Sequence, residues 1–133
     1  MKKILLLLVA FICTVGISAQ AVLSLDRTSH NFGTFKESKV QKTTFTVTNK
    51  GNKPLIIQQA FTSCGCTVAN YTKTPIQPGE KGTITVSYDG KNKFPGQFRK
   101  VVTVRSNASN SLVRIYVEGI LEKDLYSLFS DHH

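Results

Sequence analysis

Apolar side chains recur at every second position from Val22 onward, and this spacing constrains the fold more than any other feature. Residues 41–48 alternate strictly, with Phe45 and Val47 on one face and threonines on the other. Similar alternation recurs at residues 83–88, 97–106 and 113–117. Side chains of a strand point alternately to its two faces, so the pattern predicts half-buried strands. About seven such strands in roughly 100 residues predict an all-β, immunoglobulin-like β-sandwich.

Two details of this prediction depend on local residues. Residues 23–25 and 30–33 are expected to form two parts of one first strand, and residues 55–62 a strand that leads directly into a cysteine motif. Between strands, residues 49–54 predict a turn in which Asn49 and Gly51 tolerate positive φ.

The first residues predict a signal peptide rather than part of the domain. Lys2 and Lys3 precede an apolar run over residues 4–17, and small residues follow at Ala19 and Ala21. The run is shorter than the roughly 20 apolar residues of a membrane-spanning helix. We therefore expect a signal peptide over residues 1–19, cleaved after Ala19 or Ala21, and no transmembrane anchor after processing. The mature protein would then be exported, either periplasmic or secreted.

The mature chain divides into a domain over residues 22–121 and a tail over residues 122–133. The tail is expected to form a short docking helix or a frayed end. Loss of Lys2 and Lys3 lowers the formal charge from +9 to +7. Export and the lack of a basic run argue against a nucleic-acid partner. Arg99, Arg105 and Arg114 would form one patch if the last two strands are adjacent and in register.

Reactive side chains are concentrated at Cys64-Gly65-Cys66, the only cysteines left after processing. In an extended strand both thiols point to one face with Cα atoms about 6.5 Å apart, near the upper limit for a disulfide. Gly65 can shorten this distance by adopting backbone angles closed to other residues.

Three roles are open to the cysteine pair. It can be structural, as a local disulfide or as two small buried groups. It can bind Cu(I), because two thiolates suit a soft metal ion, so Cys64 and Cys66 are the candidate metal ligands. It can also exchange thiols with a partner. A structural zinc site would need four ligands.

Several short motifs together resemble a known family. They are Asn31-Phe32-Gly33, Val47-Thr48-Asn49 with Gly51 and Pro54-Leu55, Ser63-Cys64-Gly65-Cys66-Thr67, Ile76 with Pro78-Gly79-Glu80, and Gly119. In this order they resemble the bacterial domain of unknown function 1573 (DUF1573) family, from Leu25 to about Leu121. The family is similar to the immunoglobulin-like domains of flagellar and centrosomal proteins and of periplasmic pilus chaperones. The resemblance implies a fold and an exported location, and no reaction.

The remaining residues do not predict an enzyme. The eight carboxylates are scattered singly, and His30 is the only histidine before the tail. Our first hypothesis is an exported, non-enzymatic module without a cofactor that binds another protein or envelope component through a strand edge or loops. The alternative is a small periplasmic Cu(I)-binding or thiol-redox protein that uses Cys64 and Cys66. The oligomeric state stays open.

Overall fold

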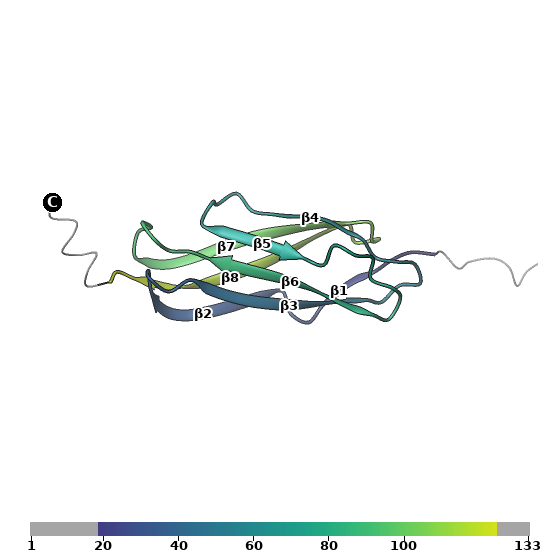
Figure 1. Cartoon of the computed structure of the whole chain (residues 1–133), viewed down its shortest axis with the longest axis horizontal. Coiled ribbons are helices and arrows are strands. Elements are labelled where there is room, and N and C mark those ends of the chain that lie inside the picture. The colour runs from purple at the N-terminus through teal and green to yellow at the C-terminus, as the bar shows by residue number, and fades with distance from the viewer. Residues whose placement is uncertain (1–18, 125–133) are drawn as a thin grey trace, which may run out of the picture.

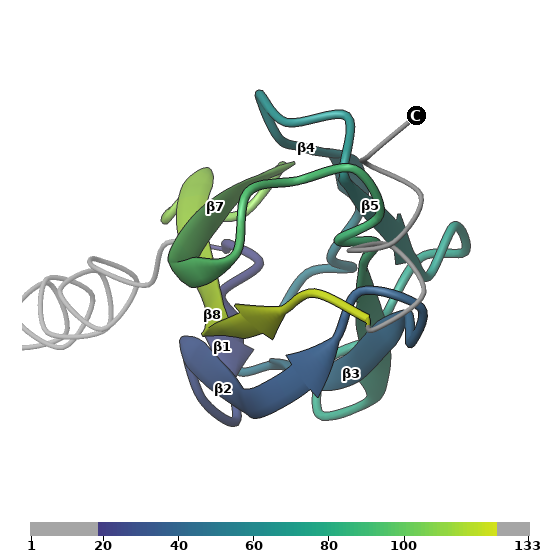
Figure 2. The same cartoon turned by 90° about the vertical axis from the view of Figure 1, so that its left-hand side faces the viewer.

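The computed structural model describes residues 19–124 as a sandwich of two four-stranded sheets (Figures 1 and 2). In chain order the strands are β1 (Leu23–Leu25), β2 (Ser29–Lys36), β3 (Gln41–Asn49), β4 (Ile57–Phe61), β5 (Thr67–Tyr71), β6 (Lys81–Tyr88), β7 (Gly96–Ser106) and β8 (Leu112–Glu122). The all-β sandwich predicted from the alternation is confirmed, with eight strands in place of about seven. The signal peptide and nearly all of the tail lie outside the described residues.

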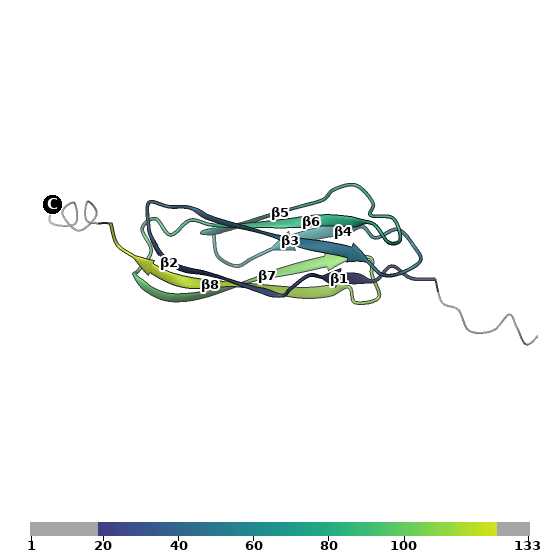
Figure 3. The same ribbon diagram turned by 90° about the horizontal axis from the view of Figure 1, so that it is seen from below.

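The first sheet has the order β1-β3-β6-β5 and the second the order β2-β8-β7-β4. All neighbours are antiparallel except β2 and β8, which run parallel side by side (Figure 3). The prediction that residues 23–25 and 30–33 belong to one strand is wrong, because β1 pairs with β3 while β2 pairs with β8 in the other sheet. The strand β5 is an addition to those predicted. No helix in residues 19–124 is long and apolar enough to span a membrane.

The core lies between the two sheets and is built from the inward positions of the alternating strands. The residues that contribute most are fully buried: Phe45, Val47, Ile84 and Val86 from the first sheet, and Val102, Val104, Ile115 and Val117 from the second. Each buried aliphatic side chain contributes about 1.5–3 kcal/mol relative to an exposed one. The period-two pattern therefore identified the core faces of the central strands correctly.

The turn after β3 is held by Asn49, whose side chain is fully buried. Its amide nitrogen donates to the carbonyl oxygens of Lys53 and Ile76 at 2.6 and 2.9 Å, and its oxygen accepts from the backbone N–H of Gly51 at 2.9 Å and of Val22 at 3.3 Å. The chain turns here as predicted, but neither Asn49 nor Gly51 adopts a positive φ. Gly51 is required for space, because a Cβ there would collide with the backbone oxygen of Gln20.

Candidate functional site

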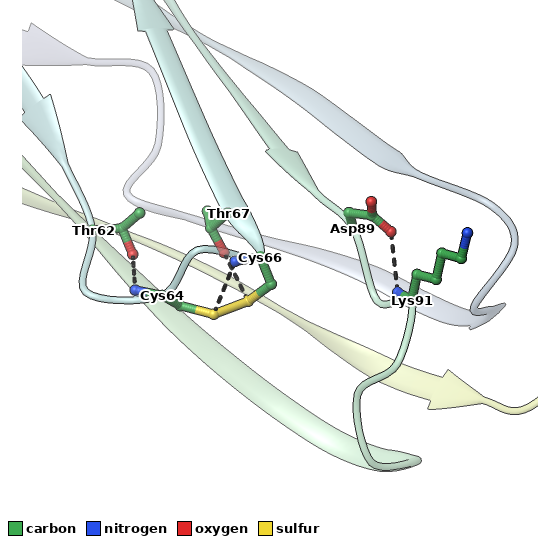
Figure 4. The surroundings of a disulfide bond; sticks show 6 residues. All are labelled: Thr62, Cys64, Cys66, Thr67, Asp89 and Lys91. Atoms are coloured by element: carbon green, nitrogen blue, oxygen red, sulfur yellow. Dashed lines mark hydrogen bonds between the residues drawn. A yellow bond between two sulfur atoms is a disulfide. The ribbon is translucent and has the colours of Figure 1, made fainter.

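The cysteine motif lies in the connection between β4 and β5, where the chain crosses from the second sheet to the first (Figure 4). The motif follows the end of a strand, as predicted, but it forms a turn and is not extended. The backbone N–H of Thr67 donates to the carbonyl oxygen of Cys64 at 3.2 Å, and the N–H of Cys64 donates to the hydroxyl of Thr62 at 3.4 Å. The turn brings the two cysteine Cα atoms within 5.2 Å.

Cys64 and Cys66 are joined by a disulfide. The backbone N–H of Cys66 also donates to Sγ of Cys64 at 3.3 Å. Gly65 has no positive φ, and a Cβ at this position would meet nothing within 4 Å. The expectation that Gly65 supplies a conformation closed to other residues is therefore wrong. The turn itself shortens the distance.

The two sulfur atoms differ in exposure. Cys66 is 6% exposed and belongs to a small cluster of buried residues with Phe35, Tyr88 and Leu121. Cys64 is half-buried and packs against the same cluster. An external thiol would therefore reach Cys64 more easily than Cys66, and Cys66 would be the leaving group in an exchange reaction.

Aromatic rings fill this end of the core. Phe98 of β7 stacks on Tyr88 of β6 with ring centroids 4.0 Å apart, and Phe35 meets both rings edge-on at 5.8 and 6.0 Å. Burial, together with the nearby charge of Asp89, raises the pKa of Tyr88, so its phenol stays neutral. The cysteine loop thus packs on an apolar cluster that links the two sheets.

Lys73 and His30 each contact a neighbouring side chain other than the cysteines. The Nζ atom of Lys73 lies 3.4 Å from the centroid of the Tyr71 ring. His30 lies half-buried in β2, where its ring meets Phe32 edge-on at 5.0 Å and its Nδ1 is 3.4 Å from a guanidinium nitrogen of Arg27. Within residues 19–124, no group of three or more His, Cys, Asp or Glu side chains is placed to hold a metal ion. Cu(I) binding by Cys64 and Cys66 stays a prediction, and it would require reduction of the disulfide first.

A second feature lies beside the cysteine loop, at the edge of the second sheet. Pairing of β4 with β7 ends at Phe61 opposite Thr103, whereas β7 begins at Gly96. Across the described part of the chain, the backbone of residues 97–102 pairs with β8 alone. A shallow groove at this end of the sheet is lined by Gln97, Phe98 and Arg99 of β7 and by Glu118 of β8. This open edge was missed from the sequence, because it depends on the register between β4 and β7, in which the end of β4 at Phe61 lies opposite Thr103.

Comparisons with known proteins agree with this architecture. Residues 23–121 match the family described as "Protein of unknown function (DUF1573)". No curated protein matches the chain.

Solved structures show the same fold at low sequence identity. A protein of unknown function from Porphyromonas gingivalis W83 superposes with a TM-score of 0.68 and 19% identity over 82% of this chain and 50% of that one, so the chain spans half the length of that protein. The ASH / PapD-like domain 7 of human CEP192 gives a TM-score of 0.62 and 7% identity, over 83% of this chain and 92% of that one. The periplasmic chaperone SfaE gives a TM-score of 0.54 and 12% identity, over 77% of this chain and 58% of that one.

Proposed function

The chain belongs to the DUF1573 family, whose description names no reaction, and we propose that it is an exported, non-enzymatic module that binds another protein or an envelope component. The contact would be an extended segment of the partner, added as a strand to the open edge of β7. Binding of this kind needs no cofactor. The likeness to a periplasmic chaperone is compatible with protein binding, although at 12% identity it concerns the fold alone.

The open stretch of β7 is the observation that carries this proposal. Residues 97–102 pair on one side only, which leaves backbone donors and acceptors on the other side. An added strand would satisfy these groups, and each hydrogen bond contributes about 1 kcal/mol net. Gln97 and Arg99 of β7 would become cross-strand neighbours of side chains on the added strand and so discriminate between partners.

Export is part of the proposal, and the contacts of Gln20 and Ala21 indicate where a signal peptide would be cleaved. Ala21 is 3% exposed and belongs to the main core cluster. Gln20 pairs with the turn after β3: its N–H donates to Oδ1 of Asn52 at 2.8 Å, and its carbonyl accepts from the Asn52 N–H at 2.9 Å. Cleavage after Ala21 would remove both residues, so we place it after Ala19.

Site-specific cross-linking tests the proposed edge. A photo-reactive phenylalanine analogue replaces Gln97 on the open edge or, as a control, Thr83, which is exposed on the first sheet, and the exported protein is irradiated in its own cells. We expect a discrete cross-linked product from position 97 and none from position 83. Equal products from both positions, or none from position 97, would contradict binding at this edge.

A thiol-redox role is the second candidate, favoured by the disulfide and the half-exposed position of Cys64. A partner thiolate would attack Sγ of Cys64 and release Cys66 as a thiolate. A second thiol of the partner would then attack the mixed disulfide, so the partner becomes oxidised and the cysteine pair reduced. The C64S/C66S double variant separates the two functions. Cross-linking from Gln97 should persist in this variant if the domain is a binding module and disappear if its contacts are mixed disulfides.

A further inference from the structure

Three of the four arginines in the chain lie on one outer surface of the second sheet, which we call the arginine face (Arg99, Arg105 and Arg114 with Phe61, Leu112 and Tyr116). The ladder between β7 and β8 pairs Arg105 with Leu112 and Thr103 with Arg114, so Arg105 and Arg114 are diagonal neighbours. Arg99 lies further along β7, opposite Glu118. The condition stated for the patch is therefore met for Arg105 and Arg114, because β7 and β8 are adjacent and in the required register, and Arg99 lies on the same face further along β7.

The charges of this face are not neutralised within the domain. Among residues 19–124, none of the three arginines forms an ion pair. Arg27, the fourth arginine, is by contrast held by Asp26 at 2.8 Å and by the hydroxyl of Thr43 at 2.7 Å. The guanidinium of Arg99 lies 4.4 Å from the centroid of the Tyr116 ring, which orients it without neutralising it. The guanidinium groups of Arg105 and Arg114 are thus available to an external anion, whereas Arg99 lies opposite Glu118.

Apolar side chains stand among these charges. Phe61 is 40% exposed and lies in the same row as Thr103 and Arg114, while Leu112 is 57% exposed beside Arg105. Arginine and aromatic residues are enriched in protein interfaces, where they contribute a large share of the binding energy.

The outer surface of the first sheet has a different composition. The outward positions of β3 and β6 carry mainly hydroxyl side chains, with the two lysines Lys42 and Lys81. This surface has positive charge without arginine, and its outward positions on β3 and β6 hold no apolar side chain. The mixture of arginine and apolar residues is therefore specific to one face of the domain.

We propose that the arginine face binds an acidic segment of a protein partner. Diagonal neighbours in an antiparallel pair are about 7–8 Å apart, close to the roughly 7 Å between alternate residues of an extended chain. A segment with carboxylates two residues apart can therefore reach both Arg105 and Arg114, and each guanidinium can hold a carboxylate through two hydrogen bonds. Phe61 and Leu112 would contact apolar side chains of the same partner. This inference rests on the proposed protein-binding function and names the chemistry of the partner.

The test measures binding of a fluorescent synthetic peptide with glutamate at every second position and serine between. The double variant R105Q/R114Q removes two charges from the arginine face, and K42Q/K81Q removes two charges from the opposite face. We expect the dissociation constant to rise about tenfold in R105Q/R114Q and less than twofold in K42Q/K81Q. The affinity of the unmodified protein should also fall with added salt.

Three outcomes would overturn this inference. Equal weakening in both double variants would mean that only the net charge attracts the peptide. Absence of peptide binding at low salt would exclude an acidic segment. Tighter, Arg105- and Arg114-dependent binding to phosphatidylglycerol vesicles or to alginate would assign the face to a membrane or a polysaccharide. If cross-linking from Gln97 persists in any of these cases, the proposed function stands and only the acidic-segment inference fails.

Discussion

Asn49 provides a sharp test of how the turn after β3 is held in place. Its side chain makes four hydrogen bonds from a fully buried position, to the start of β1, to the turn after β3 and to the segment that contains Ile76. Replacement by alanine removes all four and leaves their partners without the amide. At about 1 kcal/mol for each bond, and more for the buried Ile76 carbonyl, N49A should lower the free energy of unfolding by about 3–5 kcal/mol.

Urea denaturation followed by circular dichroism measures this loss. A small domain is stable by only about 5–15 kcal/mol, so the change is a large fraction of the total. With an m value of about 1.3 kcal/mol per M, the midpoint should fall by about 3 M. N70A is the matched control, because Asn70 is exposed on β5 and makes no side-chain hydrogen bond within residues 19–124.

A loss below about 1 kcal/mol in N49A, or an equal loss in N70A, would refute the reasoning. The first result would mean that water replaces the amide at little cost. The second would mean that the loss does not depend on the burial of the Asn49 side chain.

Three further results follow from the same structure. G51A should destabilise the domain by about 2 kcal/mol or more in urea denaturation, because its Cβ meets the Gln20 backbone. G65A should change the free energy of unfolding by less than about 0.5 kcal/mol, because a Cβ there meets nothing. Similar losses in both variants would contradict the packing of residue 20 against residue 51. C64S/C66S should cost only about 1.5 kcal/mol from the short closed loop, and a loss above about 4 kcal/mol would assign the bridge a larger structural role. Burial, with the charge of Arg27, lowers the pKa of His30, so the unfolded chain binds a proton more readily than the folded one. The melting temperature should therefore decrease as the pH falls below 6.5, the ordinary pKa of histidine. If the melting temperature of H30Q depends on pH in the same way, His30 is not the source of the effect.

Local pattern was sufficient for part of the fold. The alternation around Phe45 and Val47 identified the inward face of β3, because a strand buried on one side has an apolar residue at every second position. The assignment of β1 and β2 to different sheets was not predictable, since it depends on pairing with β3 and β8, which are distant in the chain. The buried role of Asn49 was missed for the same reason, because its partners come from three separate segments.

The candidate site divides in a similar way. The location of Cys64 and Cys66 after a strand was predicted from the sequence. The turn that brings them together was not, because it depends on the start of β5, and the alternation in this short strand is not long enough to be recognised. The open edge of β7 arises from the different lengths of β4 and β7. The arginine face could be predicted conditionally, because its formation depends only on whether β7 and β8 are adjacent and in a suitable register.

The place of β8 has a consequence for how the chain acquires its structure. β8 is the last of the eight strands along the chain, yet it lies inside the second sheet between β2 and β7, and it pairs Tyr116 with Ser29. β2 therefore has no partner until most of the chain has been synthesised, and closure of a loop this long slows folding. Until then the core-facing side of β2 stays exposed, and a chain truncated before β8 should fail to fold and should be degraded rather than persist as a partly assembled sandwich.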